Sequence, residues 1–477
     1  MSAEVDNYLT EELKNEYSDI YPLLWLIYYR TDIDGRARLL EGEWDVVPSL
    51  PRRIGKRLTY IYELLKSRYD KSKPAILMSE CFWDINRYDS FMNEILDNYN
   101  VIGTLCVYMC NPINLMKLDA LRKKVLRRRV MPVGQRLVSY ETKAVVAQIY
   151  DMLDEMKANG STCSDCRDKA KSLFDQLRQT SEADINKMTA LLKKYNVEQF
   201  VTINEYNLPD YITILACKRC GIRTKEMFHY WVQEAGQFHS YGNLAVADQH
   251  MYWNDADRDF SLKYEHFVPG YQPTINTICG CPEVTTALLT ESMEDIRKRQ
   301  GTGKTITLLV PNAVQPSLWG DFTYTDFYKV TPLAIEKTLE YWEDIFREFK
   351  RFEENSGYKV LLRFHPTNVR QGYVDHAQKI VEKYGFEQIP VFREGLFESI
   401  KRSDVIFSFS SSSLYIGYIL GCKCYCLDYH KIKVKKDFSN LDMQTVPLSE
   451  LHSLVIPEER DEPRYDLCID AAKVFEL

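Results

Sequence analysis

Residues 403–421 read SDVIFSFSSSSLYIGYILG and contain the transition that decides the fold. The apolar run DVIFSF (404–409) has the length and composition of a buried β-strand. It breaks into four consecutive serines, Ser410 to Ser413, and an apolar helical pattern then runs to Gly421, where a glycine ends it. A buried strand that leads directly into a helix is the repeating unit of a parallel sheet covered on both faces.

The same alternation continues on both sides of this unit. Strand and helix patterns follow one another in TITLLVP (305–311), EKTLEYWEDIFREFKRFEENSG (336–357), YKVLLRFHP (358–366), GYVDHAQKIVEKYG (372–385) and CKCYCLDY (422–429). We therefore expect a C-terminal doubly wound domain over residues 284–440. Residues 441–477 would form a tail able to pack back on the N-terminal domain.

The N-terminal half shows the same pattern, in AILMSE (75–80), VIGTLCVYM (101–109), QFVTINEYN (199–207), YITILACKRCG (211–221) and TINTICGCP (274–282). Residues 142–200 are strongly helical and polar, which indicates a helical insertion or lid. The predicted fold class is α/β, with two Rossmann-like doubly wound domains facing a cleft and an N-terminal domain over residues 1–283.

Composition limits the function classes. Of 477 residues, 45% are hydrophobic and 27% charged, and the formal net charge is only -7 with both signs interspersed, so we expect no nucleic-acid partner. The polar N-terminus has no secretory signal pattern, and the longest apolar runs are about half of a membrane span. These features predict a cytoplasmic protein.

The chain has 13 cysteines, and many of them fit free thiols in a reducing compartment. Five lie inside apolar strand or helix patterns, where a thiol behaves as a small buried hydrophobe: Cys106, Cys110, Cys422, Cys424 and Cys426. Two pairs, Cys163/Cys166 and Cys217/Cys220, have the C-x-x-C spacing of a zinc or redox site, but neither belongs to a compact two-half zinc motif. We predict no metal site.

Ligands of open parallel sheets bind outside the carboxyl ends of the strands. In the C-terminal half, polar groups follow four predicted strands at that edge: Asn312, His365 with Pro366, Ser410 to Ser413, and Asp428. We expect His365 and the serines to lie on neighbouring strand ends. The sequence therefore predicts one ligand site there.

The serines present hydroxyls and free backbone N–H groups at a helix start, where the helix dipole favours an anion such as phosphate. The alternative is that they only cap the helix. A histidine that donates to a phosphate oxygen would stabilise a phosphorylated leaving group, and Pro366 restricts His365 to an extended conformation aimed outward. A structural histidine is the alternative. Arg363 is two residues before His365 and on the same face of the strand. It either adds positive charge to this site or is a solvated surface residue.

The FHP motif (364–366) after a central strand and the SSSS motif (410–413), in a chain of two Rossmann-like units, resemble a known family. They are similar to the His-Pro and Ser-Ser motifs of GT-B glycosyltransferases with cytidine-linked donors: bacterial sialyl- and polysialyltransferases, capsule Kdo transferases and CDP-glycerol glycerophosphotransferases. In the N-terminal half, residues 204–231 and TICGCPEV (277–284) resemble stretches of surface-polysaccharide transferases. Phe228-His229-Tyr230 stands where that family has Gln-His-Gly.

The resemblance implies an inverting, metal-independent transferase with no cofactor, whose co-substrate is a CMP- or CDP-linked sugar or glycerol phosphate. Its acceptor would be a surface glycan or glycolipid. A carboxylate of the N-terminal domain would remove the acceptor proton. Glu205 and Glu80 both follow predicted strands and fit this role. The family's own acidic motif has only Asp32 and Asp34 of DIDG as a counterpart.

Two alternatives stay open. Residues 118–130, LDALRKKVLRRRV, have the pattern of a helix that rests on anionic lipid at the inner membrane face or on a polyanionic acceptor, or of a solvated basic face docked on its own core. The chain is also compatible with a non-catalytic protein that keeps the GT-B scaffold as a nucleotide-binding or assembly module.

Overall fold

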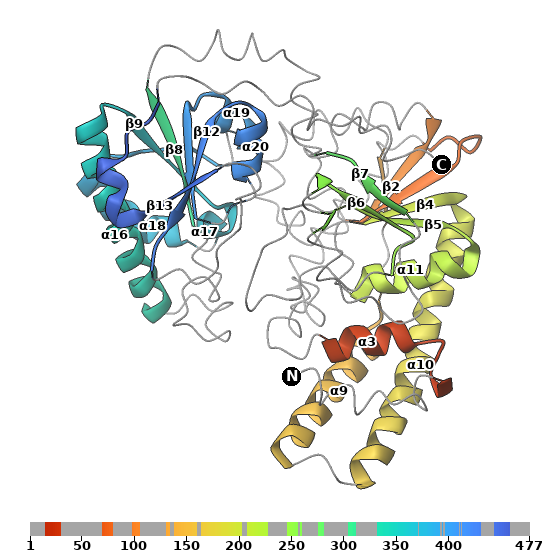
Figure 1. The fold of residues 1–477 in the computed structure, drawn as a ribbon. Helices are drawn as coiled ribbons and strands as arrows, with labels where there is room; N and C mark the ends of the chain where they lie inside the picture. The colour runs from red at the N-terminus through yellow and green to blue at the C-terminus, as the bar shows by residue number, and fades with distance from the viewer. Residues whose placement is uncertain are drawn as a thin grey trace.

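The structure is a computed structural model, and it contains two α/β domains in sequence order (Figure 1). The residues it describes are 15–29, 69–79, 98–104, 130–133, 138–159, 164–202, 208–227, 246–255, 258–259, 275–280, 304–311, 332–370, 372–391, 394, 396–409, 411, 413–430 and 443–457.

The N-terminal domain is built on a seven-stranded sheet in the order β3-β2-β1-β4-β5-β6-β7. Its strands are β1 (Ala75–Met78), β2 (Asn100–Thr104), β3 (Val130–Val133), β4 (Val197–Thr202), β5 (Arg223–Met227), β6 (Gln249–Tyr252) and β7 (Ile275–Ile278). All neighbouring strands pair in parallel. Burial of a central strand on both faces explains why Ala75–Met78 is continuously apolar.

In the part of this domain that the structure describes, the helices are α3 (Tyr21–Tyr29), α9 (Tyr140–Asn159), α10 (Ser164–Lys194) and α11 (Leu208–Cys220). The long α9 and α10 fill the sequence between β3 and β4 and extend away from the sheet as a pair (Figure 1). Ser139 caps α9, since its hydroxyl accepts from the Thr142 N–H at 3.2 Å. At the end of α11, Gly221 has a φ of 65°, the left-handed conformation typical of a glycine that stops a helix.

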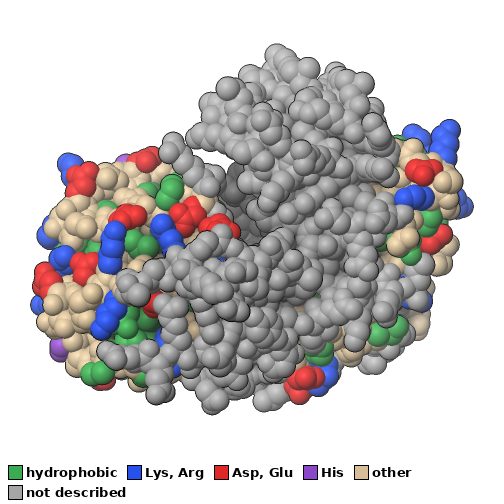
Figure 2. Space-filling model, turned by 90° about the horizontal axis from the view of Figure 1, so that it is seen from above, with side chains coloured by type: hydrophobic (Ala, Val, Ile, Leu, Met, Phe, Trp, Pro, Cys, Tyr) green, Lys and Arg blue, Asp and Glu red, His purple; other side chains and the backbone are tan. Residues whose placement is uncertain are grey.

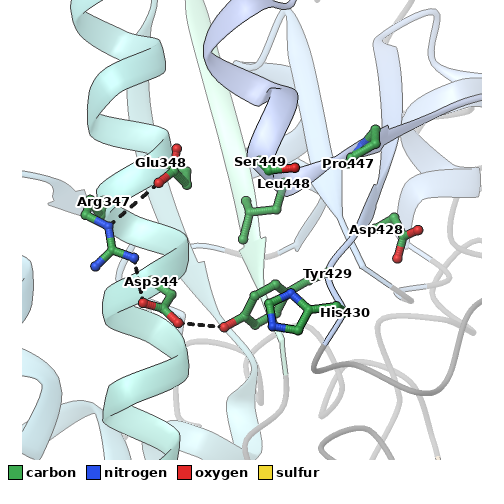
Figure 3. Close-up of a pocket in the computed structure, with 9 residues that line it drawn as sticks. All are labelled: Asp344, Arg347, Glu348, Asp428, Tyr429, His430, Pro447, Leu448 and Ser449. Atoms are coloured by element: carbon green, nitrogen blue, oxygen red, sulfur yellow. Dashed lines mark hydrogen bonds and ion pairs between the residues drawn. The ribbon is translucent and has the colours of Figure 1, made fainter.

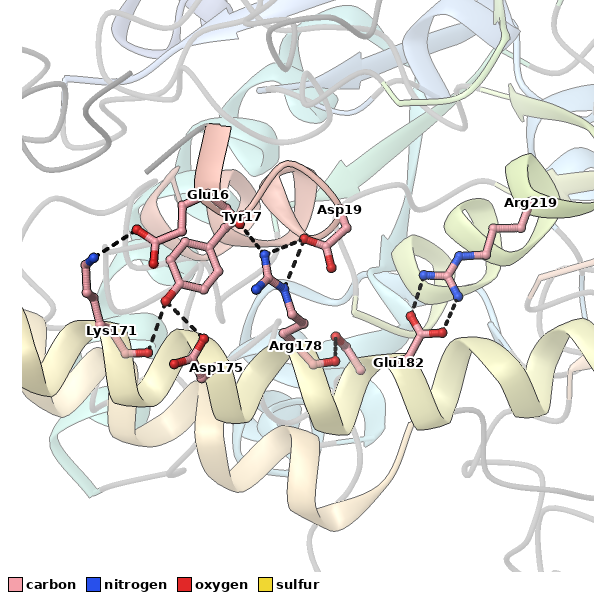
Figure 4. A network of polar contacts seen from close by, with 9 residues as sticks. Glu16, Tyr17, Asp19, Lys171, Asp175, Arg178, Glu182 and Arg219 are labelled. Carbon is pink, nitrogen blue, oxygen red and sulfur yellow. Dashed lines mark hydrogen bonds and ion pairs between the residues drawn. The ribbon is translucent and has the colours of Figure 1, made fainter. Parts of the chain in front are cut away.

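The segment before α3 is tied to α10 by a polar network (Figure 4). The buried Tyr17 hydroxyl donates to Asp175 Oδ1 at 3.1 Å, and the Arg178 guanidinium lies 4.5 Å from the Tyr17 ring centre. Burial, followed by the hydrogen bond to Asp175, raises the pKa of Tyr17 to about 12. One turn further, Glu182 of α10 forms a two-pronged ion pair with Arg219 of α11. These contacts hold the segment before α3, and also α11, against α10.

The C-terminal domain has a six-stranded parallel sheet in the order β10-β9-β8-β11-β12-β13. Its strands are β8 (Thr305–Val310), β9 (Lys359–Phe364), β10 (Glu387–Gln388), β11 (Val405–Ser408), β12 (Lys423–Asp428) and β13 (Gln444–Pro447). Its helices are α16 (Pro332–Ser356), α17 (Pro366–Arg370), α18 (Tyr373–Tyr384), α19 (Leu396–Lys401), α20 (Ser413–Ile419) and the short 3₁₀ helix η5 (Leu448–Ser453).

Alternate strand residues of this sheet enter two separate hydrophobic clusters, as expected for side chains that point to opposite faces. One cluster joins strand residues such as Leu308, Leu362 and Phe407 to α16, α18 and η5. The other joins Ile406 and its neighbours to α19 and α20. Cys422, Cys424 and Cys426 are buried thiols of this second cluster, which confirms the prediction that they are buried.

The prediction of two doubly wound α/β units is therefore confirmed. The C-terminal domain, however, extends past residue 440: β13 pairs with β12, and Asn355 of α16 donates to the His452 carbonyl. The predicted tail therefore begins inside this domain, because β13 adds an edge strand to its sheet. Residues 458–477 lie outside the described part.

On the face shown in Figure 2, acidic and basic side chains are interspersed over the C-terminal domain. Among the helices that the structure describes, none has both the length and the hydropathy needed to span a bilayer.

Candidate functional site

The strand order places the candidate site of the C-terminal domain. Numbered from one within the domain, β10-β9-β8-β11-β12-β13 is the order 3-2-1-4-5-6. In this order the chain reverses its direction of winding between β8 and β11, and ligands of doubly wound sheets bind outside the carboxyl ends of the two strands at such a point. We call residues 410–413 the serine segment. Its described residues, Ser411 and Ser413, come shortly after β11, so they lie at this switch point.

The described serines form a tight turn into α20. The Ser408 hydroxyl accepts from the Ser411 N–H at 3.1 Å, and the Ser411 hydroxyl accepts from the Ser413 N–H at 3.2 Å. The Ser411 carbonyl accepts from the Leu414 N–H at 3.1 Å and so begins the helix. Capping is therefore one role of these serines. A hydroxyl that accepts one bond still has its own proton to donate, so Ser408 and Ser411 also suit an oxygen-rich ligand.

His365 follows β9 and is exposed, while Pro366 is the first residue of α17. Proline is favoured at the first position of a helix, because the N–H of that residue makes no hydrogen bond within the helix. The buried Asn368 side chain donates to the Pro311 carbonyl at 3.1 Å and ties α17 to the end of β8. Sequence reasoning missed Asn368, although an asparagine beside FHP was a signal for such an anchor.

The expectation that His365 and the serines lie on neighbouring strand ends is wrong. β8 lies between β9 and β11, so the two segments are two strand spacings apart, about 10 Å. Both still flank the end of β8. A ligand in contact with His365 and the serines would have to extend across the Pro311 end of that strand.

Arg363 is buried, which excludes the alternative of a solvated surface residue. Its guanidinium donates to Ser399 Oγ at 2.6 Å and to the Glu394 carbonyl at 3.2 Å. Burial lowers the pKa of Arg363 to about 10, while the charge of Glu394 acts in the opposite direction. The described contacts of Arg363 thus fix α19 on the sheet.

Asp428, the last residue of β12, lines a cavity of about 420 Å³ at the carboxyl ends of β12 and β13 (Figure 3). On the α16 side of this cavity, the Tyr429 hydroxyl donates to Asp344 Oδ2 at 2.7 Å, and Arg347 pairs with the same carboxylate at 2.6 Å. The volume suits a small ligand. The cavity is one strand away from the serine segment, because β12 pairs with β11.

Several predicted residues lie outside the described part of the chain. These are Glu80, Glu205, Asn312, Ser410, Ser412, the Asp32/Asp34 pair, Phe228-His229-Tyr230, Cys106, Cys110, Cys163 and the basic residues of 118–129.

The N-terminal domain has its own switch point, between β1 and β4, and buried polar residues occupy it. Ser79 directly follows β1, and its hydroxyl donates to Thr202 Oγ1 at 3.0 Å. Thr202 ends β4 and donates in turn to Asp210 Oδ2 at 2.6 Å, in the first turn of α11. Glu80 and Glu205 follow Ser79 and Thr202 in sequence by one and three residues.

A row of polar residues continues from Thr202 across this sheet. Thr202 is in register with Glu226 of β5, Glu226 with His250 of β6, and His250 with Asn276 of β7. In a parallel sheet, residues in register point to the same face. His250 Nε2 and Glu226 Oε2 are 3.7 Å apart, and both side chains are buried. We call these four residues the polar row. Sequence reasoning missed the polar row, although Glu226 and His250 are ionisable residues within buried strands and could have indicated it.

Of the two cysteine pairs, Cys217/Cys220 lies within the described residues. Cys217 is buried in α11, where burial raises its thiol pKa well above the usual range, and Cys220 is half-buried at the end of the same helix. Within the described ranges, no three His, Cys, Asp or Glu side chains are grouped so that they could hold a metal ion.

Comparison with known proteins gives structural similarity only. No protein-family model matches the sequence, and no curated protein matches it. Among solved structures, the UDP-GlcNAc 2-epimerase of Methanocaldococcus jannaschii is 10% identical, over 84% of this chain and 96% of that chain, with a TM-score of 0.48.

A UDP-GlcNAc 2-epimerase of Neisseria meningitidis bound to UDP-GlcNAc is 9% identical, over 80% of this chain and 90% of that chain, with a TM-score of 0.43. A glycosyltransferase of Rickettsia africae is 9% identical, over 84% and 87% of the two chains, with a TM-score of 0.42.

Proposed function

We propose that the chain is an inverting GT-B glycosyltransferase that moves a sugar, or glycerol phosphate, from a cytidine-linked donor to a glycan or glycolipid acceptor. The observation that carries this proposal is the serine segment at the switch point of a 3-2-1-4-5-6 sheet, with His365 on the other side of β8. Hydroxyl and imidazole donors at this edge suit the phosphate of a nucleotide.

In the proposed reaction, the C-terminal domain holds the donor. Ser411 and Ser413 donate to phosphate oxygens, and His365 stabilises the charge that develops on the departing phosphate. For a sugar donor, the acceptor oxygen forms a bond to the anomeric carbon, while the bond from that carbon to the phosphate oxygen breaks and its electron pair leaves with the nucleotide. Asp428 and Asn312 would contact the donor beside these groups.

The N-terminal domain supplies the base that takes the acceptor proton. Glu205 is the favoured residue and Glu80 the alternative, since both follow strands at the N-terminal switch point. The basic segment 118–130 would place the enzyme on an anionic membrane surface or hold a polyanionic acceptor.

A non-catalytic nucleotide-binding protein is the second candidate. The observation that favours it is the capping geometry of Ser408 and Ser411, which gives these hydroxyls a structural role without any reaction.

The test is calorimetry on the full chain with CMP, CDP, UDP and GDP, followed by an assay for slow hydrolysis of CMP- and CDP-linked donors. We expect the cytidine nucleotides to bind most tightly and their donors to be hydrolysed. Preference for a uracil or guanine nucleotide would remove the cytidine assignment. Binding without hydrolysis would favour the non-catalytic protein, and the absence of any nucleotide binding would refute both.

A further inference from the structure

One side chain of the N-terminal domain is buried in the core of the C-terminal domain. Trp253 directly follows β6 and is only 2% exposed. It belongs to the cluster formed by Leu309, Ile406, Tyr415 and other residues around α19 and α20, in which it is the one N-terminal-domain residue among the described members. A contact of this kind fixes one domain against the other.

The partner of Trp253 is in the helix that follows the serines. The rings of Trp253 and Tyr415 stack with centroids 5.8 Å apart and planes inclined by 23°. Tyr415 is two residues after Ser413, the first residue of α20, and Ser411 accepts from the Ser413 N–H. Because these residues lie within one helical turn and its cap, a shift of Tyr415 also shifts Ser413.

The other contacts of α20 leave it little freedom within its own domain. Gly417 is buried, and a Cβ atom added there would lie 2.4 Å from Ile406 Cδ1 and 3.1 Å from Cys424 Sγ. The helix therefore sits directly on β11 and β12 at Gly417. Tyr415 in the same helix contacts the other domain.

The position of Trp253 is set by the N-terminal sheet. β6 pairs with both β5 and β7, and it carries His250 of the polar row three residues before Trp253. A short series of contacts therefore joins the polar row to the serine segment: from His250 along β6 to Trp253, across the ring stack to Tyr415, and along α20 to Ser413.

We propose that Trp253 is a positioning residue: its stack on Tyr415 holds the serine segment at a fixed position relative to the acceptor side of the N-terminal domain. This inference rests on the proposed function. The donor phosphate and the acceptor base are held by different domains, so the reacting atoms meet only if the two domains keep one relative position. Misplacement by about 1 Å can lower a rate by about 100-fold.

The test compares Trp253→Leu, Trp253→Phe and a control, Trp342→Phe, at a fully buried tryptophan of α16 in the C-terminal core. For Trp253→Leu we expect kcat to fall by about 10- to 100-fold, with the CMP dissociation constant nearly unchanged because the nucleotide contacts only the C-terminal domain. Trp253→Phe keeps an aromatic stack and should recover most of kcat. Trp342→Phe should lower thermal stability without the loss of kcat.

A spectroscopic measurement gives a second readout. The emission of Trp253, isolated as the difference between wild type and Trp253→Phe, should change when CMP binds, because Tyr415 lies so close to the serines. A Trp253→Leu variant with normal kcat, or one in which kcat falls only in proportion to the folded fraction, would overturn the inference and leave the proposed function intact. A wild-type chain that neither binds nucleotides nor turns over donors would instead refute the proposed function, and the inference with it.

Discussion

Glu226 and His250 lie opposite each other on adjacent strands of the N-terminal sheet, with 3.7 Å between Oε2 and Nε2, and both are shielded from solvent. A carboxylate and an imidazole lose their hydration when they are buried, so they persist in a core only with polar partners. Tyr252 provides a further contact, since its hydroxyl lies 3.4 Å from His250 Nδ1.

We predict that the effects of replacing Glu226 and His250 are coupled. Glu226→Leu or His250→Leu alone should lower the free energy of unfolding by about 1–3 kcal/mol, because either change removes a polar neighbour from a buried polar group. The double variant should be more stable than the sum of the single effects predicts. Urea unfolding of the four proteins measures this coupling, and effects that add within about 0.5 kcal/mol would show that the two residues are independent.

The second prediction concerns His365. His365→Ala should lower the rate constant for transfer by about 100- to 1,000-fold, the loss seen when one charge-stabilising donor is removed. Thermal stability should change little, because the side chain is exposed. His376→Ala in α18, also exposed, is the matched control and should leave the rate unchanged. Retained activity in His365→Ala would mark His365 as a residue outside the reaction.

The third prediction tests the acceptor side. Glu205→Gln should abolish transfer but leave CMP binding intact, since the donor is held by the other domain. Single-turnover assays and calorimetry on the same preparation separate the two effects. Normal transfer by this variant would eliminate Glu205 and move the assignment to Glu80, to Asp84 four residues after it, or to the Asp32/Asp34 pair.

The fourth prediction uses the close approach of α20 to β11. Gly417→Ala should destabilise the protein by about 1–3 kcal/mol through overpacking against Ile406, which exceeds the gain of about 0.5–1 kcal/mol in helix propensity. Ile406→Val removes the Cδ1 atom that the new methyl group would meet. The double variant should therefore be more stable than Gly417→Ala alone. Thermal unfolding of the three variants measures this. A double variant whose loss of stability equals the sum of the two single losses would contradict the prediction.

The fifth prediction concerns alkaline pH. The pKa of Tyr17 is about 12 in the folded protein and 10.0 for an ordinary tyrosine, so the folded state keeps this proton where the unfolded state loses it. The stability that Tyr17 contributes is fully present below pH 10 and is lost as pH rises to 12. The stability difference between wild type and Tyr17→Phe should thus shrink over this range. Urea midpoints between pH 8 and 12 measure it, with Tyr140→Phe at an exposed position as the control.

Strand and helix positions could be predicted where apolar runs are strong. Runs such as Thr305–Val310 and Ala75–Met78 are buried on both faces of a sheet, so their composition alone indicates a strand. β13 (Gln444–Pro447) was missed because its four residues have no such run, and it is a strand only through pairing with β12. The position of β8 between β9 and β11 depends on how the crossover helices pack, which no local pattern contains.

The candidate site could be predicted only in part, because the sequence shows strand ends but not the contacts between strands. The sequence indicates which residues follow a strand: His365 does follow β9, Ser411 comes after β11, and Asp428 ends β12. It does not indicate what long side chains contact. Arg363 lies between Leu362 and Phe364 in a buried strand, so alternation directs it into the opposite core layer, where it binds Ser399. Glu226 and His250 are brought together by pairing of β5 with β6, which only the folded sheet defines.

Each sheet is drawn from one uninterrupted stretch of chain, residues 75–278 for the first and 305–447 for the second. No described strand is exchanged between the two. On the ribosome, the first sheet can therefore be completed before the second has emerged, in line with the tendency of domains to fold as units from the N-terminus. Trp253 would then be exposed on a finished first domain until α20 is made, and its burial against Tyr415 would be among the last events of synthesis.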